Sequence, residues 1–157
     1  MKQKETHYLT QEGADKLQEE LKYLINTARV EVSKRLRTAI QQGDLSENAD
    51  YISAKEEQGF LEGRIQELQQ ILSNTILIDD LERDITVIGI GDTVLIQEAD
   101  FPVEEYFIVG PNEADPTNGK ISHKSPIGNA LLGRKVGDQV IVDTPNGKSQ
   151  FKILEIK

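Results

Sequence analysis

The sequence predicts an α+β protein with a long antiparallel α-helical coiled-coil hairpin in residues 1–79 and a small antiparallel β-sheet domain with one short helix in residues 80–157. Two observations support this division. Residues 10–73 contain no Pro and place an apolar residue at every third or fourth position, which is the helical period. After residue 80 the pattern changes to short β-branched runs, and all five Pro lie from Pro102 onward.

The first helix is predicted from Gln11 to just before Gly43. Thr10 is a suitable N-cap, and Gly43 is a natural stop. A helix of about 32 residues is roughly 48 Å long, which exceeds what a domain of this size needs for its own core. The helix carries one apolar stripe in steps of three and four, made of Leu17, Leu21, Leu24, Ala28, Val32, Leu36 and Ala39.

The second helix is predicted from Asn48 to Ser73. Its apolar stripe has the same spacing and contains Leu61, Ile65, Leu68 and Leu72. Only residues 43–47 separate the two helices, and connections this short join antiparallel neighbours. The connection is therefore expected at the exposed tip of the hairpin.

The second half is predicted to contain five short strands. Each is a β-branched or aromatic run bounded by Gly, Pro or Asn. A short helix is expected around residues 129–132, ended by Gly133. The predicted strands are residues 85–88, 93–96, 106–109, 139–142 and 151–154.

The composition excludes several classes of function. The formal net charge is −9, and each half is acidic, which argues against a general nucleic-acid-coating protein. Any nucleic acid is therefore expected to be reached through a partner. The absence of Cys excludes disulfides and zinc–sulfur sites, and two His are too few for a His-rich metal centre. No apolar run is long enough to span a membrane, so a cytoplasmic protein is expected.

Two acids, Asp44 and Glu47, lie in the connection between the helices. Carboxylates are ligands for Mg²⁺, which commonly takes one or two of them together with phosphates and waters. Two acids on a probe could therefore complete a metal site supplied elsewhere without forming one alone. The alternative is structural, because Asp44 with Glu47 three residues later also fits a capping box at the start of the second helix.

The first helix also carries a basic segment, which could contact RNA or DNA phosphates near the acidic tip. The alternative is an ordinary solvated helix face, since mixed charges decorate most exposed coiled-coil surfaces. The segment consists of Arg29, Lys34, Arg35 and Arg37, opposed only by Glu31.

In the second half, Ser125, Pro126 and Ile127 precede the predicted short helix. Pro126 and Ile127 could form an exposed apolar patch for protein docking, or the segment could simply pack as a turn followed by a helix. His123 has no Ser or carboxylate at a telling spacing and is interpreted as a loop residue. Neither a G-x-S-x-G motif nor a P-loop is present.

Four segments carry a resemblance to a known family. They are Gly43-Asp44-Leu45-Ser46-Glu47-Asn48-Ala49-Asp50-Tyr51, the following Glu57-Gln58-Gly59-Phe60-Leu61-Glu62-Gly63-Arg64-Ile65, and Ser125-Pro126-Ile127-Gly128-Asn129-Ala130-Leu131-Leu132-Gly133 with Pro145-Asn146-Gly147. Together they resemble the bacterial Gre transcript cleavage factors, closest to the GreA branch, over nearly the whole chain.

The resemblance implies an accessory factor without turnover of its own. An FKBP-like C-terminal domain would bind bacterial RNA polymerase, with Ser125, Pro126 and Ile127 near the docking surface. The coiled coil would enter the secondary channel and reach the nascent RNA 3′ end. Asp44 and Glu47 would help to hold the second Mg²⁺ of the polymerase, so that backtracked RNA is cleaved. The factor is expected to be a monomer that binds no membrane.

One departure from the family concerns contacts to RNA. Family members often carry Arg and His just before the tip, where this chain has Gln41 and Gln42, while Arg37 and Lys55 keep basic character nearby. Weaker RNA contact is expected, which favours the GreA-like preference for short fragments over the GreB-like one.

Two other functions remain as alternatives. A polymerase inhibitor of the same shape could block the channel, although a run of consecutive acids at the tip would fit that function better. A prolyl isomerase could use the C-terminal half, but only Phe101, Tyr106, Phe107 and Phe151 are available there to line an apolar pocket.

Overall fold

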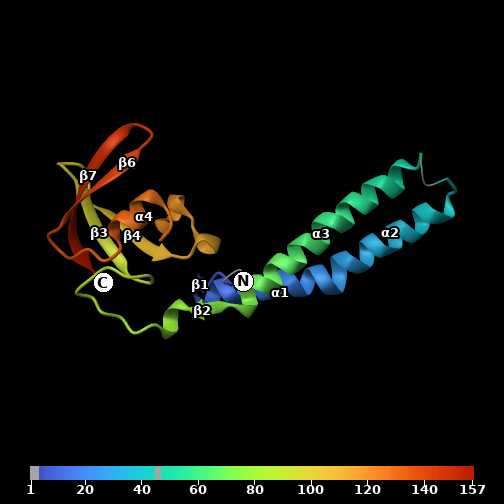
Figure 1. The fold of residues 1–157 in the computed structure, drawn as a ribbon, viewed down its shortest axis with the longest axis horizontal. Helices are drawn as coiled ribbons and strands as arrows, with labels where there is room; N and C mark the ends of the chain where they lie inside the picture. Colours follow the sequence, from blue (N-terminus) through green and yellow to red (C-terminus); the bar gives the residue numbers. More distant parts are fainter. Residues whose placement is uncertain (1–3, 45–46) are drawn as a thin grey trace. The chain divides into compact units, whose positions relative to one another are not determined.

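The computed structural model describes residues 4–44 and 47–157, and the chain divides into two compact units. Ala14–Asn74 form the helical unit, and Thr6–Gly13 together with Thr75–Lys157 form the sheet unit. Figure 1 shows the long helices of the first unit and the strands of the second. A mixed α+β protein with a long helical region is therefore confirmed.

The first long helical segment contains α1 (Gln11–Tyr23), a π-helical turn (Leu24–Ala28) and α2 (Arg29–Gln41). Its start agrees with the prediction, because the backbone N–H of Gly13 donates to Thr10 Oγ1 at 3.0 Å. Its end also agrees, since Gly43 has a φ of 116°, which residues other than Gly rarely adopt.

The π-helical turn explains an irregularity in the apolar stripe of this segment. From Leu24 to Leu36 the stripe advances by four residues three times in succession. A regular α-helix has 3.6 residues per turn, so this spacing would carry the stripe progressively round the helix. The wider π turn takes up the extra residue, and Val32 and Leu36 remain buried.

The second long helix, α3, spans Ala49–Ser73 and runs antiparallel to the first segment. Ion pairs between the two segments show this direction. Residues with higher numbers in the first segment pair with residues that have lower numbers in α3. These pairs are Glu20 with Arg64, Arg29 with Glu62 and Arg35 with Glu57. The seam beneath them buries Val32, Leu36, Ala54, Leu61 and Ile65.

The sheet unit contains two sheets, and not all of their strand pairs are antiparallel. β1 (His7–Leu9) and β2 (Thr75–Leu77) form a parallel pair. The larger sheet has the order β5-β4-β3-β7-β6, in which the β4–β5 pair is parallel and the others are antiparallel. Its strands are β3 (Thr93–Glu98), β4 (Glu104–Val109), β5 (Lys120–Ser122), β6 (Gln139–Thr144) and β7 (Gly147–Ile156).

One hydrophobic core holds the larger sheet together. The helix α4 (Pro126–Leu131) packs against the sheet and contributes Leu131, which is fully buried. It begins three residues earlier than predicted because Ser125 caps it, and Gly133 ends it with a φ of 77°. The strands contribute most of the other buried side chains, including Val94, Ile96, Ile108, Val140 and Ile153.

The strand predicted at residues 85–88 is wrong. The Asp84 carboxylate accepts hydrogen bonds from both the backbone N–H and the hydroxyl of Thr86, which folds this segment into turns. These bonds hold the pKa of Asp84 below its ordinary value, because they favour the charged carboxylate. The short strands β1, β2 and β5 were not predicted.

Candidate functional site

The two predicted tip acids lie on the segment that connects α2 to α3. Asp44 and Glu47 are both exposed, and they flank Leu45 and Ser46, which lie outside the described residues. The connection follows the end of α2 at Gln41 and precedes the start of α3 (Figure 1). Both side chains therefore lie at the surface at this end of the helical unit.

The structural alternative for Asp44, an N-cap of the second helix, is wrong. The N-cap of α3 is Asn48, whose Oδ1 accepts the backbone N–H of Tyr51 at 3.1 Å. Because Asn48 takes the capping position, the N-cap lies four residues after Asp44 and the helix starts at Ala49. Neither acid is needed as the N-cap.

The donor set at the tip fits a shared metal site better than a complete one. Among the described residues there is no group of three or more His, Cys, Asp or Glu that could hold a metal ion. Two exposed carboxylates nevertheless match the oxygen ligands that Mg²⁺ takes beside substrate phosphates and waters. Asp44 and Glu47 can therefore contribute ligands to a site whose other ligands come from a partner.

Two cations of the basic segment have structural partners on α3. Arg29 makes a two-bond ion pair with Glu62, with its Nε and Nη2 each 2.8 Å from a carboxylate oxygen. The hydrogen bond to Glu62 is the main reason why the pKa of Arg29 is raised. Arg35 pairs with Glu57. These two residues tie the antiparallel segments together.

The other basic positions near the tip are exposed. Lys34 and Arg37 lie on the surface of α2, and Lys55 on α3 is exposed with its Nζ 3.3 Å from Gln58 Oε1. The basic residues therefore fall into two groups. Arg29 and Arg35 form ion pairs between the helices, whereas Lys34, Arg37 and Lys55 face solvent. The predicted RNA-proximal residues, Arg37 and Lys55, belong to the second group.

The predicted docking residues mark the start of α4. Ser125 Oγ accepts the backbone N–H of Gly128 at 3.1 Å and donates to the Ser122 carbonyl at 2.6 Å. Pro126 is exposed, whereas Ile127 is half-buried and packs against the core of the sheet. Pro126 is thus the most accessible of the three, whereas Ser125 caps the helix and Ile127 packs against the core.

Comparisons with known proteins identify the family. A model described as "Transcription elongation factor, N-terminal" matches residues 7–76, and one described as "Transcription elongation factor, GreA/GreB, C-term" matches residues 83–157. The chain is 48% identical to transcription elongation factor GreA of Shouchella clausii and 44% identical to that of Clostridium acetobutylicum, with all of each chain covered. The chain belongs to the GreA/GreB family of transcription elongation factors.

A solved structure is also similar to this GreA/GreB-family chain. It is GreA factor homolog 1 (Gfh1) of Thermus thermophilus, which is 29% identical, with 98% of this chain and 99% of that chain covered and a TM-score of 0.45. The family assignment depends on the sequence matches. The predicted resemblance to Gre factors is therefore confirmed, and the two relatives above both carry the GreA name.

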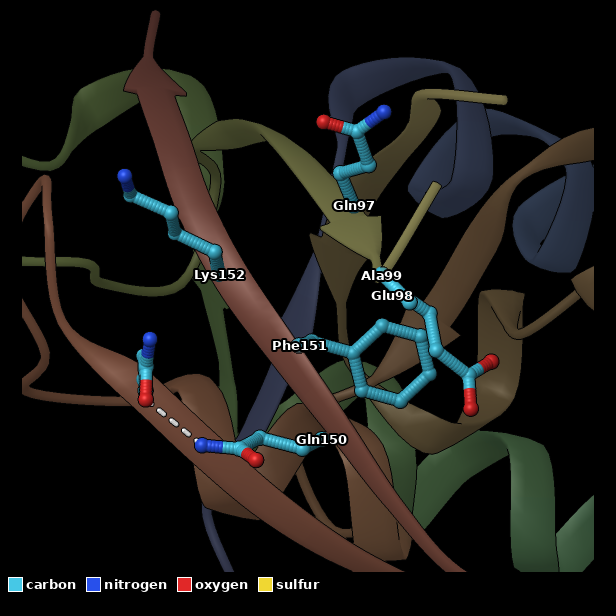
Figure 2. A pocket seen from close by; sticks show the side chains of 7 residues that line it. Gln97, Glu98, Ala99, Gln150, Phe151 and Lys152 are labelled. Atoms are coloured by element: carbon cyan, nitrogen blue, oxygen red, sulfur yellow. Dashed lines mark hydrogen bonds between the residues drawn. The ribbon is translucent and has the colours of Figure 1, made fainter. Parts of the chain in front are cut away.

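The sheet unit of this family member has a hollow of about 350 Å³, which Figure 2 shows from close by. Its lining includes Gln97, Glu98, Lys152 and Gln150, and Gln150 donates to Gln139 at 2.6 Å. Phe151 is the single aromatic side chain among the lining residues and belongs largely to the core. Five of the seven lining residues are polar or charged, so the hollow differs from the mainly apolar, aromatic pocket that a prolyl isomerase would need.

Other features of the helical unit were not predicted from the sequence. Asn48 was expected only as the first residue of the second helix, although an Asn directly before an apolar-periodic run is itself a cap signal. Phe60 is 81% exposed on α3, and nothing lies within 4 Å of a Cβ placed at Gly59 or Gly63. Separately, none of the helices within residues 4–44 and 47–157 is long and apolar enough to cross a bilayer.

Proposed function

We propose that this transcription elongation factor stimulates cleavage of backtracked RNA by bacterial RNA polymerase. In this proposal residues 1–79 form a coiled-coil hairpin that enters the secondary channel of the polymerase. Residues 80–157 form an FKBP-like domain that docks on the polymerase surface. The factor acts as a monomeric, cytoplasmic accessory protein, and the polymerase supplies the catalytic centre.

The observation that carries this proposal is the position of Asp44 and Glu47. Both are exposed on the connection between two long antiparallel helical segments. The helix α3 alone has 25 residues, which at about 1.5 Å per residue corresponds to roughly 37 Å. A helix of this length holds the connection with its two carboxylates far from the other end of the helical unit.

The acids would act as ligands in a Mg²⁺ site that the polymerase holds. A divalent ion in such a site stabilises the negative charge that develops on the attacking and leaving oxygens of a phosphoryl displacement. Asp44 and Glu47 would bind and orient at that site. Arg37 and Lys55, which are exposed near the same end, would lie beside the nascent RNA 3′ end and its phosphates.

Docking would involve Ser125, Pro126 and Ile127 at the start of α4. Pro126 is exposed there and Ile127 is half-buried, so a partner can cover apolar surface without unfolding the sheet unit. Replacing Pro126 with Asp should weaken polymerase binding because it places a charge at a desolvated contact. Unchanged affinity would remove this docking surface.

A stalled polymerase complex with backtracked RNA tests the proposal. Addition of the factor with Mg²⁺ should shorten the RNA from its 3′ end, and the factor alone should leave free RNA intact. Asp44→Ala or Glu47→Ala should reduce this cleavage by about 100-fold or more, as expected when a group that acts only in the transition state is removed. Polymerase affinity should change little.

Glu56→Ala is the matched control, because Glu56 is also an exposed acid on the helical unit but lies within α3. The Glu56→Ala variant should stimulate RNA cleavage as strongly as the wild type does. Normal cleavage by both tip variants would show that the metal-ligand assignment is wrong. Inhibition of nucleotide addition without any cleavage would instead favour the alternative of a channel-blocking inhibitor.

A further inference from the structure

The side chain of Asn48 joins the two long helical segments at the end that carries the acids. Its Oδ1 accepts the Tyr51 backbone N–H at 3.1 Å, and its Nδ2 donates to the Ala39 carbonyl oxygen at 2.8 Å. The first bond is within the start of α3, whereas the second crosses to the last turns of α2. One side chain therefore ties both ends of the connection that contains Asp44 and Glu47.

The acceptor of the crossing bond is well defined. The Ala39 carbonyl also accepts the backbone N–H of Gln42 at 3.1 Å, and Ala39 is only 2% exposed. Carbonyl groups in the last turn of a helix lack partners within that helix and need them from elsewhere. A carbonyl has two lone pairs, and here one takes the local N–H while the other takes the Asn48 amide.

The residue type matters because the two bonds need different chemistry. An amide supplies a donor and an acceptor from one short side chain, whereas a carboxylate supplies only acceptors. Asp is as good an N-cap as Asn, so helix capping alone does not require Asn at this position. Helix capping therefore does not explain the hydrogen bond that the Asn48 amide donates to the Ala39 carbonyl.

We propose that Asn48 is a positioning residue for the tip acids. Its amide holds the end of α2 to the start of α3, which restricts the places that Asp44 and Glu47 can occupy. Since two carboxylates act on a shared metal site only when they are held in a productive geometry, loss of the crossing bond lowers cleavage without removing a ligand. This inference rests on the function proposed above.

Asn48→Asp separates positioning from capping. The variant keeps an acceptor for the Tyr51 N–H but places a carboxylate oxygen opposite the Ala39 carbonyl, so the crossing bond is lost. We expect its maximal cleavage rate at saturating factor to fall about tenfold, while polymerase affinity stays within about twofold. Its melting temperature should remain close to that of the wild type, because the cap is retained.

Two further variants serve as controls. Ala49→Asp adds a negative charge at the exposed first residue of α3 without removing either bond of Asn48, and it should keep nearly the wild-type cleavage rate. Asn48→Ala removes both bonds, so it should lose cleavage and also destabilise the start of α3. Full cleavage with Asn48→Asp, or an equal loss with Ala49→Asp, would overturn the positioning role.

Amide hydrogen exchange on the free protein provides a readout that does not depend on the polymerase. In Asn48→Asp, the backbone amides of Gln42 and Gly43, which donate to the Ala39 and Ile40 carbonyls at the end of α2, should exchange at least about fivefold faster, the factor expected from one lost hydrogen bond. Identical exchange in the two proteins would contradict the proposed role of Asn48. If wild-type factor stimulated no cleavage, the proposed function would fail while this measurement still decided whether Asn48 holds the tip.

Discussion

The helical unit and the sheet unit are stabilised in different ways. In the helical unit, a narrow seam of five buried side chains is bordered by ion pairs whose members are about 40–50% exposed. In the sheet unit, eleven buried side chains from the sheet, α4 and the loop before β3 form one core. The sheet unit also buries a charge, because Asp92 is 3% exposed and pairs with Arg83 at 3.0 Å.

This difference has a functional reason under the proposed function. A probe that enters a channel has to stay thin, so it cannot build a wide core, and it gains its order from a regular stripe and from paired charges. A docking domain has no such constraint. The helical unit should therefore tolerate changes on its surface, while the sheet unit should respond strongly to small changes inside.

The largest expected contrast comes from matched deletions in the two cores. Ile96 in β3 is 0% exposed and Ile65 in α3 is 1% exposed. Ile96→Ala should cost about 2–5 kcal/mol, and Ile65→Ala should lie near the lower end of that range, because two helices can close on a cavity more easily than a sheet core can. Denaturant unfolding of both variants, followed by circular dichroism, measures the difference. An equal or larger loss of unfolding free energy in Ile65→Ala would contradict the expected difference between the two cores.

Glycine-to-alanine substitutions should have opposite signs in the two units. A Cβ at Gly128 in α4 would lie 2.0 Å from the Ser122 carbonyl oxygen, so Gly128→Ala should destabilise the protein by about 1–3 kcal/mol. Nothing lies within 4 Å of a Cβ at Gly59 in α3, so Gly59→Ala should stabilise it by up to about 1 kcal/mol. Melting temperatures of the two variants would show the signs directly, and the same sign for both would contradict the description of either site.

The ion pairs of the helical unit should contribute little individually. Arg64 pairs with Glu20 at 2.7 Å and with Glu67 at 2.9 Å, and its side chain is 39% exposed. Arg64→Gln should therefore cost below about 1 kcal/mol at low salt, and less at high salt, where surface charges are screened. A loss that did not change between low and high salt would show that packing, not charge, is the main contribution of Arg64.

The smallest expected effect is on stability at alkaline pH, and it comes from Tyr106 in the sheet unit. Burial, with a hydrogen bond to Glu104, raises the pKa of Tyr106 from its ordinary 10.0 to about 12. Unfolded chains lose this proton first, so the stability that Tyr106 contributes is complete below pH 10 and is lost as the pH rises through 12. The phenolate absorbance of the wild type minus that of Tyr106→Phe should rise near pH 12. A rise near pH 10 would contradict the raised pKa.

The helical unit was largely predictable because its order is local and periodic. The stripe from Leu17 to Ala39 gave the first segment, and Thr10, Gly43 and Asn48 marked its ends and the start of α3. The π-helical turn was not predicted, although the repeated steps of four between Leu24 and Leu36 were its signal. The tip acids were found from their place in the chain, but the crossing bond of Asn48 requires coordinates.

The sheet unit was less predictable because its order depends on distant partners. The run Ile85-Thr86-Val87-Ile88 has strong β propensity, but hydrogen bonds from Thr86 to Asp84 fold it into turns. The reverse holds for β5, where three residues become a strand only because β4 lies alongside. Whether a segment becomes a strand depends on the strands beside it as well as on its own residues. A single sequence therefore predicts strands only in part.

The dependence of RNA cleavage on Mg²⁺ concentration is the direct test of whether Asp44 and Glu47 act as metal ligands. Stalled polymerase complexes would be titrated with Mg²⁺ alone, with the wild-type factor, and with Asp44→Asn or Glu47→Gln at saturating concentration. The wild type should lower the Mg²⁺ concentration for half-maximal cleavage, whereas both variants should leave it near the factor-free value. Variants that lowered it as much as the wild type would contradict the assignment of these acids as metal ligands.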